Sequence, residues 1–203
     1  MGSVVRSDSL ASLTPAGRQA MADYGVTTVI DLRADSETLR DPKHDGAMVR
    51  RIPVVDDDLF PELQERPDMG DRYVLILDRG QPAFGAVFNA IADAEGGVLV
   101  HCFAGKDRTG LVAAMMLTLA GVNPEAIGAD YAETDVQLAT KYEEWLASAA
   151  PERLESMRDE LRCPPHWMLQ ALGHLESRWG GVAGYLEAAG VSSAALARLE
   201  SRL

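Results

Sequence analysis

Hydrophobic positions in the first half of the chain form short runs, separated by segments in which they recur with helical spacing. The run at 27–32 is continuous, apolar and rich in β-branched residues, which is typical of a strand buried in a parallel sheet. Strands are predicted at 27–32, 48–54 and 98–101, and helices at 73–77 and 84–94. Strands that alternate with helices favour an α/β fold, with a mainly parallel central sheet flanked by helices.

Helix starts and breaks can also be placed. Thr14 followed by Pro15 is typical of a helix start, and small or apolar residues recur from there to Gly25. The acidic, proline-rich segment 56–67 predicts a loop. From about residue 123 the pattern is all helical, with breaks expected near residues 151, 164–165, 180–181 and 190. We therefore expect a single domain over residues 1–203 with a helical C-terminal part.

The decapeptide HCFAGKDRTG, from His101 to Gly110, lies between the strand at 98–101 and an apolar run that predicts a buried helix. Such a loop directs successive N–H groups into one cavity at a helix N-terminus, where they can hold a phosphate. Cys102 and Arg108 would add a thiol nucleophile and a guanidinium that binds two phosphate oxygens. These features predict a cysteine-dependent phosphatase loop. Its expected phosphate-binding residues are Phe103, Ala104, Gly105, Lys106, Asp107 and Arg108.

The residue types in this loop have chemical reasons. A helix N-terminus and a nearby cation favour the thiolate form of cysteine, so we expect Cys102 to be ionised at neutral pH. Thr109 can donate its hydroxyl to the sulfur and stabilise it as a leaving group. Gly105 permits a backbone conformation that a Cβ would block. We expect His101 to orient the loop through hydrogen bonds rather than to act as a base, because a thiolate needs none.

Other interpretations of the loop fit less well. A Walker A nucleotide loop needs a glycine where Val100 stands. A sulfurtransferase loop usually has its arginine one residue nearer the cysteine, where Asp107 stands. A structural cysteine followed by a chance arginine leaves the rest of the pattern unexplained. The alternative from another class is a catalytically silent module that binds a phosphorylated partner, although such a module has no need of Cys102.

With this loop the chain resembles the bacterial tyrosine/serine phosphatases of the protein tyrosine phosphatase superfamily. Further landmarks stand in the family order, at Arg6-Ser7, 25–33, Asp130-Tyr131, 181–186 and Gly190-Val191. The resemblance implies a phosphomonoesterase that acts on phosphotyrosine, with phosphoserine, phosphothreonine or phosphoinositides as further substrates. With a lysine at position 106, the loop resembles the loops of phosphoinositide phosphatases. In those enzymes a second cation can hold an additional phosphate of the substrate. The alternative for Lys106 is a solvent-facing position at the pocket rim.

A phosphatase also needs an acid to protonate the leaving oxygen. The resemblance and the sequence offer two candidates, Asp107 inside the loop and Asp56 in the acidic run after the second predicted strand. Asp107 is favoured because the loop fixes its position, whereas Asp56 needs a closure step. Residues 56–58 could equally be a solvated acidic turn. Asp31, Arg33 and Asp130 are expected to brace neighbouring segments rather than to touch substrate.

Two predicted helices within 136–161, split near Pro151, carry apolar positions that either pack on the core or cover the mouth of the site. The net charge of −12 argues against nucleic-acid partners. Two cysteines give no disulfide framework and favour a reducing, cytoplasmic location, with Cys163 as an incidental thiol. No apolar run is long enough to span a membrane. His44, His166 and His174 lack metal-ligand spacing, so we expect no metal and no cofactor. The oligomeric state stays open.

Overall fold

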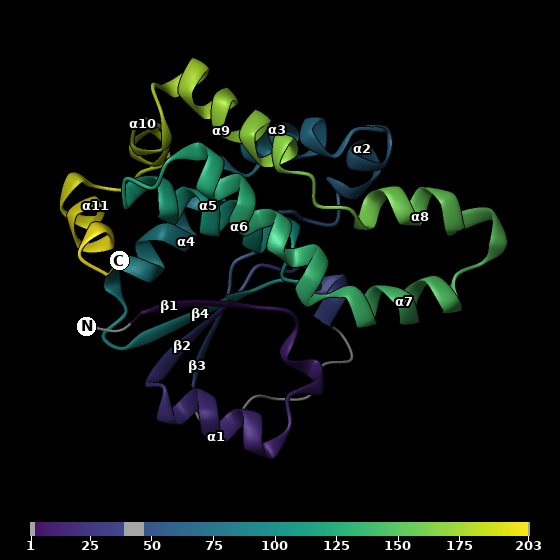
Figure 1. The fold of residues 1–203 in the computed structure, drawn as a ribbon. Helices are drawn as coiled ribbons and strands as arrows, with labels where there is room; N and C mark the ends of the chain where they lie inside the picture. Colours follow the sequence, from purple (N-terminus) through teal and green to yellow (C-terminus); the bar gives the residue numbers. More distant parts are fainter. Residues whose placement is uncertain (1–2, 39–46, 203) are drawn as a thin grey trace.

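The computed structural model describes residues 3–38 and 47–202. Within these residues, four parallel strands form one sheet in the order β1-β4-β2-β3 (Figure 1). The strands span Val4–Ser7 (β1), Val26–Asp31 (β2), Met48–Arg51 (β3) and Gly97–His101 (β4). β4 is buried along its whole length because it lies between β1 and β2. The loop that follows β4 therefore leaves from the middle of the sheet.

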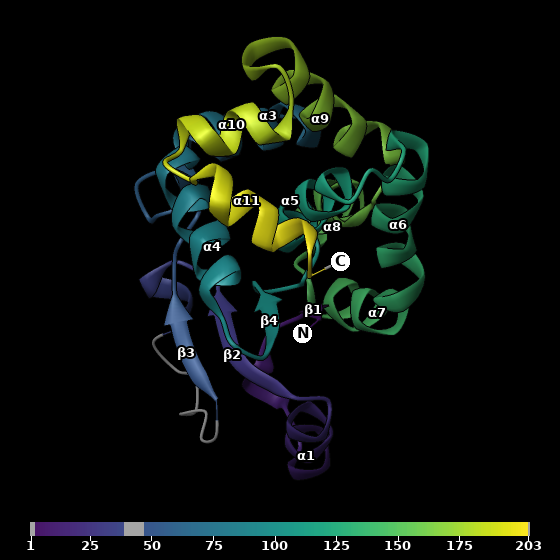
Figure 2. The ribbon, with the colours of Figure 1, turned by 90° about the vertical axis from the view of Figure 1, so that its left-hand side faces the viewer.

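Helices cover the two faces of the sheet unequally. Figures 1 and 2 show α1 on one face and α4, α5 and the C-terminal helices on the other. The α-helices span Pro15–Asp23 (α1), Phe60–Gln64 (α2), Met69–Arg79 (α3), Gln81–Asp93 (α4), Asp107–Leu119 (α5), Pro124–Gln137 (α6), Ala139–Ser148 (α7), Leu154–Leu161 (α8), Pro165–Trp179 (α9), Val182–Ala188 (α10) and Ser193–Glu200 (α11). Short 3-10 helices span Leu10–Ser12 (η1), Asp35–Thr38 (η2) and Pro151–Arg153 (η3). No helix in the described ranges is long and apolar enough to cross a membrane.

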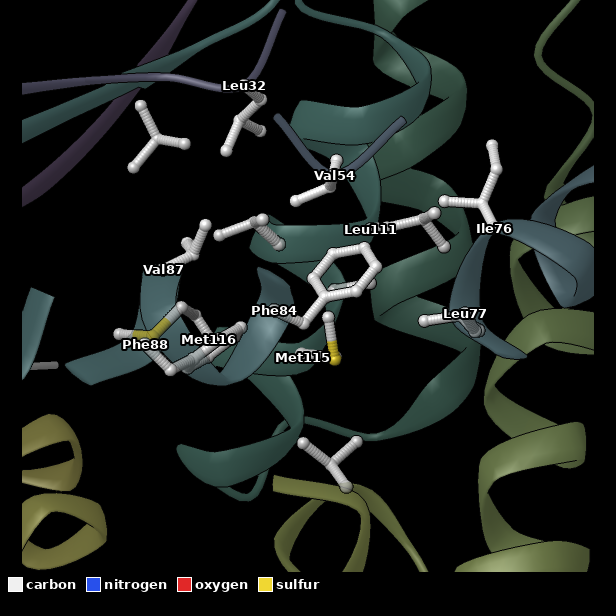
Figure 3. Close-up of a cluster of buried hydrophobic side chains, with 14 of the residues drawn as sticks. Leu32, Val54, Ile76, Leu77, Phe84, Val87, Phe88, Leu111, Met115 and Met116 are labelled. Carbon is white, nitrogen blue, oxygen red and sulfur yellow. The ribbon is translucent and has the colours of Figure 1, made fainter. Parts of the chain in front are cut away.

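The main hydrophobic core lies between the sheet and the helices that follow it. Leu32 and Val54 meet side chains of α3, α4 and α5 there, with Phe84 at the centre of the view (Figure 3). This cluster includes residues from Ile30 to Leu199 along the chain. Buried side chains of α9, α10 and α11 therefore belong to the same core as those of the sheet. A smaller cluster of Leu10, Val26, Val29 and Leu99 lies on the α1 face. The loop after β4 is thus attached to the best-packed part of the molecule.

The structure confirms the predicted α/β class with a parallel sheet and most of the expected elements. The helical breaks also fall where expected, and Gly180 ends α9 in a left-handed conformation with φ of 70°. The expected loop at 56–67 is wrong in part, because α2 lies inside it. Pro61 occupies the first turn of α2, where a missing N–H costs nothing.

Two strands also differ from expectation. β3 ends at Arg51, two residues before Pro53, which lacks the N–H that a continuing ladder would use. β1 was not predicted at all. Its four residues are only partly buried at the edge of the sheet, so they carry no apolar run to mark them.

Candidate active site

The loop from Cys102 to Lys106 joins the end of β4 to the start of α5, as the sequence predicts. Cys102 is only 2% exposed, so its thiol lies at the base of the loop rather than on the surface. The N–H groups and the dipole at the start of α5 favour an anion beside it. The thiol thus stands where a nucleophile beneath a bound phosphate would be placed.

Three carbonyl groups of the loop bond to donors outside it. These contacts are His101 Nδ1 to Cys102 O at 3.0 Å, Ser9 N to Phe103 O at 2.9 Å and Arg6 Nη2 to Gly105 O at 3.2 Å. The first contact requires the proton of the imidazole to be on Nδ1, which matches the expected orienting role of His101. In a peptide plane the C=O and N–H groups point in opposite directions. Carbonyls held outward therefore turn the amides of the loop inward, where a phosphate would bind.

Gly105 is required by the shape of the loop. Its φ of +69° lies in the left-handed region, which side chains rarely adopt. A Cβ at this position would also lie 2.5 Å from the carbonyl oxygen of Ser7 at the end of β1. β1 and the loop can approach this closely only because residue 105 is glycine.

Arg6 connects β1 to the loop and to α6. Its Nη1 donates to Asp130 Oδ2 at 2.8 Å, while Nη2 reaches Gly105 O and Thr134 Oγ1. Asp130 is therefore a brace, as expected, and it acts through Arg6. Arg6 itself was recognised in the sequence only as a landmark, because its partner lies 124 positions away.

Asp31 and Arg33 form a buried ion pair at the end of β2. Arg33 donates Nε to Asp31 Oδ1 at 2.9 Å and Nη2 to Oδ2 at 2.8 Å. Burial by itself raises the pKa of Asp31, but the hydrogen bonds and charge of Arg33 outweigh it and lower the pKa below its ordinary value. The two residues brace each other as expected. Leu32 N also donates to His101 O at 2.9 Å, which ties this brace to the end of β4.

Arg108 forms a two-point ion pair with Glu37 of η2. Nη1 and Nη2 lie 2.5 and 2.7 Å from the two carboxylate oxygens, and both side chains are mostly buried. Burial alone lowers the pKa of Arg108, but Glu37 and the nearby Cys102 raise it above its ordinary value, so the guanidinium stays charged. Glu37 takes two of the five N–H groups of Arg108 and leaves three for a phosphate. No motif in the sequence marks Glu37 as a site residue.

Asp107, the first residue of α5, lies beside Arg108 at the edge of a cavity of about 520 Å³. Its Oδ1 accepts a hydrogen bond from the hydroxyl of Tyr73 at 2.5 Å. Lys106 Nζ lies 3.3 Å from the same oxygen. Tyr73 and Lys106 therefore hold the carboxyl group of Asp107 at Oδ1, and the group can still face the cavity.

Asp56 has a different place. Its Oδ1 accepts from the N–H of Leu59 at 3.0 Å, which closes a turn just before α2. It borders a separate hollow with Glu62 and Arg79 rather than the cavity beside Asp107. Asp56 therefore does not line the cavity that Asp107 and Arg108 border. The segment after β3 does reach the site, but through Val55, which lines the cavity at Asp107.

Lys106 does not stand at a solvent-facing rim, which was one of its two expected positions. Its side chain is 3% exposed, and its ammonium donates to the carbonyl of Glu160 at the end of α8. It also lies 5.6 Å from the centre of the Trp167 ring, a distance at which a cation is attracted to the ring face. Lys106 thus links the loop to α8 and α9 instead of standing at a solvent-facing rim.

The remaining loop residues are placed as follows. The Thr109 hydroxyl is buried and makes no hydrogen bond within the described residues, so the expected bond to the Cys102 sulfur is not formed here. Phe103 is 52% exposed and stacks on Trp145 of α7, with ring centroids 5.7 Å apart. Ala104 lines a separate hollow beside Arg6.

The α7–α8 pair lies outside the main core, and residues of η3 and α8 border the cavity at Asp107. Tyr142 is the buried residue of α7, and α8 buries none of its side chains. In Figure 1 the two helices project from the body of the molecule at one side. Arg153 and Glu160 from this region line the cavity with Asp107 and Arg108. These contacts contradict simple packing of the pair on the core, which was one of the two expectations.

Apart from His101, the histidines and the second cysteine lie outside the loop. His174 Nε2 pairs with Asp78 at 2.8 Å, the His166 ring contacts Trp167, and His44 lies outside the described residues. In the described ranges no cluster of three or more histidine, cysteine or acidic side chains could hold a metal. Burial raises the pKa of the Cys163 thiol to about 12, so this thiol is neutral at physiological pH.

Fold and site together define the class of proteins that hold a phosphate monoester over a cysteine, in a loop between a strand and a helix. The family model described as the Tyrosine phosphatase family matches residues 1–203, and the chain belongs to this family. It is a protein-tyrosine phosphatase.

Three relatives agree with this assignment. A tyrosine-protein phosphatase of Nostoc commune is 36% identical, with 98% of this chain and 73% of that protein aligned. The triple specificity protein phosphatase PtpB of Mycobacterium tuberculosis is 29% identical, over 100% of this chain and 91% of that protein. A putative tyrosine-protein phosphatase of Cupriavidus necator is 27% identical, over 91% of this chain and 73% of that protein.

Proposed function

We propose that the chain hydrolyses phosphate monoesters through a cysteinyl-phosphate formed on Cys102. The sulfur attacks phosphorus, and an S–P bond forms while the bond to the leaving oxygen breaks. Water then attacks phosphorus, the S–P bond breaks with its electron pair returning to sulfur, and inorganic phosphate leaves. The observation that carries this proposal is the set of outward-held carbonyls around a buried Cys102, because inward amides can stabilise the charge of the transferred group.

Arg108 and Asp107 complete the reaction. The three N–H groups of Arg108 that Glu37 leaves free can bind two phosphate oxygens side by side. Asp107 gives its proton to the leaving oxygen in the first step and takes a proton from the attacking water in the second. We favour Asp107 over Asp56 because Asp107 borders the cavity next to Arg108, whereas Asp56 is engaged in a turn on another side.

The cavity favours phosphotyrosine as the main substrate. Beside Asp107 and Arg108 its wall combines charged side chains with apolar ones that could contact an aromatic ring, namely Val55, Phe60, Leu63, Met69 and Ile76. A relative named as a triple specificity phosphatase favours more than one substrate class, so phosphoserine, phosphothreonine and phosphoinositides stay candidates. Lys106 would reach a second phosphate only by leaving the Glu160 carbonyl. A thiolate mechanism also requires reduced Cys102, which favours the reducing cytoplasm.

The two buried cysteines offer a matched test of the proposal. Cys102→Ser should abolish turnover of an aryl phosphate while retaining phosphate binding measured by calorimetry, because serine keeps the shape of the loop but lacks a thiolate. Cys163→Ser changes the same atoms in another buried site and should keep turnover near that of the wild type. Comparable residual turnover in both variants would remove Cys102 from the role of nucleophile. Loss of phosphate binding in Cys102→Ser would mean that the loop had been disrupted.

A further inference from the structure

Two buried tyrosines lie directly behind Asp107. Tyr73 comes from α3 and Tyr131 from α6, and their exposed fractions are 0% and 1%. The Tyr73 hydroxyl donates to Asp107 Oδ1 at 2.5 Å and lies 2.6 Å from the Tyr131 hydroxyl. The two rings meet edge to face, with centroids 6.1 Å apart and planes at 87°. Three helices thus bring three oxygen-bearing side chains into one line that ends at Asp107.

The direction of this chain follows from the number of hydrogens. Tyr73 has one hydroxyl hydrogen, and the structure gives it to Asp107. Tyr131 must therefore be the donor to Tyr73, which makes two hydrogen bonds aligned in the same sense, and aligned bonds strengthen one another. Burial raises the pKa of Tyr73 and of Tyr131, and the nearby Asp107 charge raises both further. Both hydroxyls therefore stay protonated and able to donate.

The same contacts distinguish the two oxygens of Asp107. Tyr73 and Lys106 both address Oδ1, whereas Oδ2 has no partner within the described part of the chain. A carboxyl group that accepts hydrogen bonds at one oxygen carries its own proton on the other, because the first oxygen already faces donors. Oδ2 is thus the atom that can deliver a proton to a substrate in the cavity.

We infer that Tyr73, backed by Tyr131, is a positioning residue that fixes the rotation of the Asp107 carboxyl group and makes Oδ2 the proton donor. The inference rests on the proposed role of Asp107 as the acid. Neither tyrosine touches the substrate. Their effect is geometric, since proton transfer to the leaving oxygen requires the donor to be within hydrogen-bond reach of it.

The test compares leaving groups in Tyr73→Phe. An activated nitrophenyl ester needs little protonation of its leaving oxygen, whereas phenyl phosphate needs a great deal. For phenyl phosphate we expect kcat to fall about tenfold, which is the loss that corresponds to one hydrogen bond. For the nitrophenyl ester kcat should change by less than about twofold, and KM and vanadate inhibition should stay near wild type, because the phosphate loop is untouched. Tyr131→Phe should show the same pattern more weakly.

Tyr185→Phe is the matched control. Tyr185 is also fully buried, and its hydroxyl donates to the Leu77 carbonyl at 2.7 Å, away from the catalytic loop. Tyr185→Phe removes one buried tyrosine hydroxyl, as Tyr73→Phe does. Its effect therefore measures what that change costs the fold alone. It should leave the ratio of the two rates unchanged.

Asp107→Asn separates failure of the inference from failure of the proposed acid. In this background, adding Tyr73→Phe should have no further effect on the ratio of the two rates, because the effect passes through Asp107. If kcat falls more for phenyl phosphate than for the nitrophenyl ester in Asp107→Asn but not in Tyr73→Phe, the positioning role of Tyr73 is overturned and Asp107 remains the acid. Absence of that difference in both variants would overturn both assignments. Should Tyr73→Phe not fold, the same comparison with Tyr131→Phe decides the inference.

Discussion

Replacing Glu37 with glutamine would remove the negative partner of Arg108 at almost constant size. In the wild type the carboxylate holds Nη1 and Nη2 of Arg108 at 2.5 and 2.7 Å, and the two side chains are only 18% and 12% exposed. Glutamine offers one acceptor oxygen in place of two and turns an NH2 group toward the guanidinium. Arg108 would then keep its charge but lose its fixed orientation.

The size of the effect follows from the freedom that Arg108 regains. An arginine side chain carries about 2 kcal/mol of rotamer entropy, and without Glu37 the phosphate must restrict that freedom on binding. This corresponds to about a 30-fold loss in kcat/KM and in phosphate affinity. Loss of one partner of a mostly buried pair should also lower stability by about 1–3 kcal/mol.

Steady-state kinetics with an aryl phosphate, phosphate binding by calorimetry and thermal unfolding together test this prediction. Glu62→Gln is the matched control, because both carboxylate oxygens of Glu62 accept from Arg79, through its Nη2 at 2.6 and 2.8 Å, on an exposed surface away from the loop. It should change kcat/KM little. If Glu37→Gln binds phosphate more tightly and keeps its kcat/KM, Glu37 competes with substrate for Arg108 rather than positioning it, and the reasoning is wrong.

Further predictions concern the loop, the sheet and the mouth of the site. Gly105→Ala should lose more stability and activity than Gly121→Ala, because both have positive φ but only position 105 also meets backbone within 4 Å; equal losses would refute the steric argument. Asp31→Asn should cost about 1–3 kcal/mol, because the buried Arg33 loses the charged acceptor of two of its side-chain hydrogen bonds. Because the Asp31 pKa is lowered in the folded state, its contribution is present above pH 3.8 and is lost as the pH falls further, so the urea midpoints of variant and wild type should converge there. Vanadate should increase hydrogen-exchange protection in 136–161 if α7 and α8 cover the site, and unchanged protection there would reject the cover. Chelators should leave turnover intact, and inhibition reversed by a divalent ion would contradict the mechanism.

The sequence by itself determined the parts of the protein that depend on local order. A buried strand, a loop with glycine at position 105 and a buried helix after the loop follow from neighbouring residues, and the structure confirms these elements. Helix ends at proline and glycine were predictable for the same reason, since these residues restrict or free their own backbone angles. The short helix α2 was missed because Pro61 was taken for a loop signal, although it stands in the first turn.

Only the tertiary structure decided what surrounds the loop. Arg6 and Glu37 reach it from 99 and 71 positions away, and Tyr73 from 34. Such partners leave no periodic pattern, because a single polar side chain at one position does not show which distant backbone or charge it will face. Strand order and helix packing bring them together, and the burial that results makes each contact specific. The residues that we propose to react could therefore be identified from the sequence, whereas the residues that hold them in position could not.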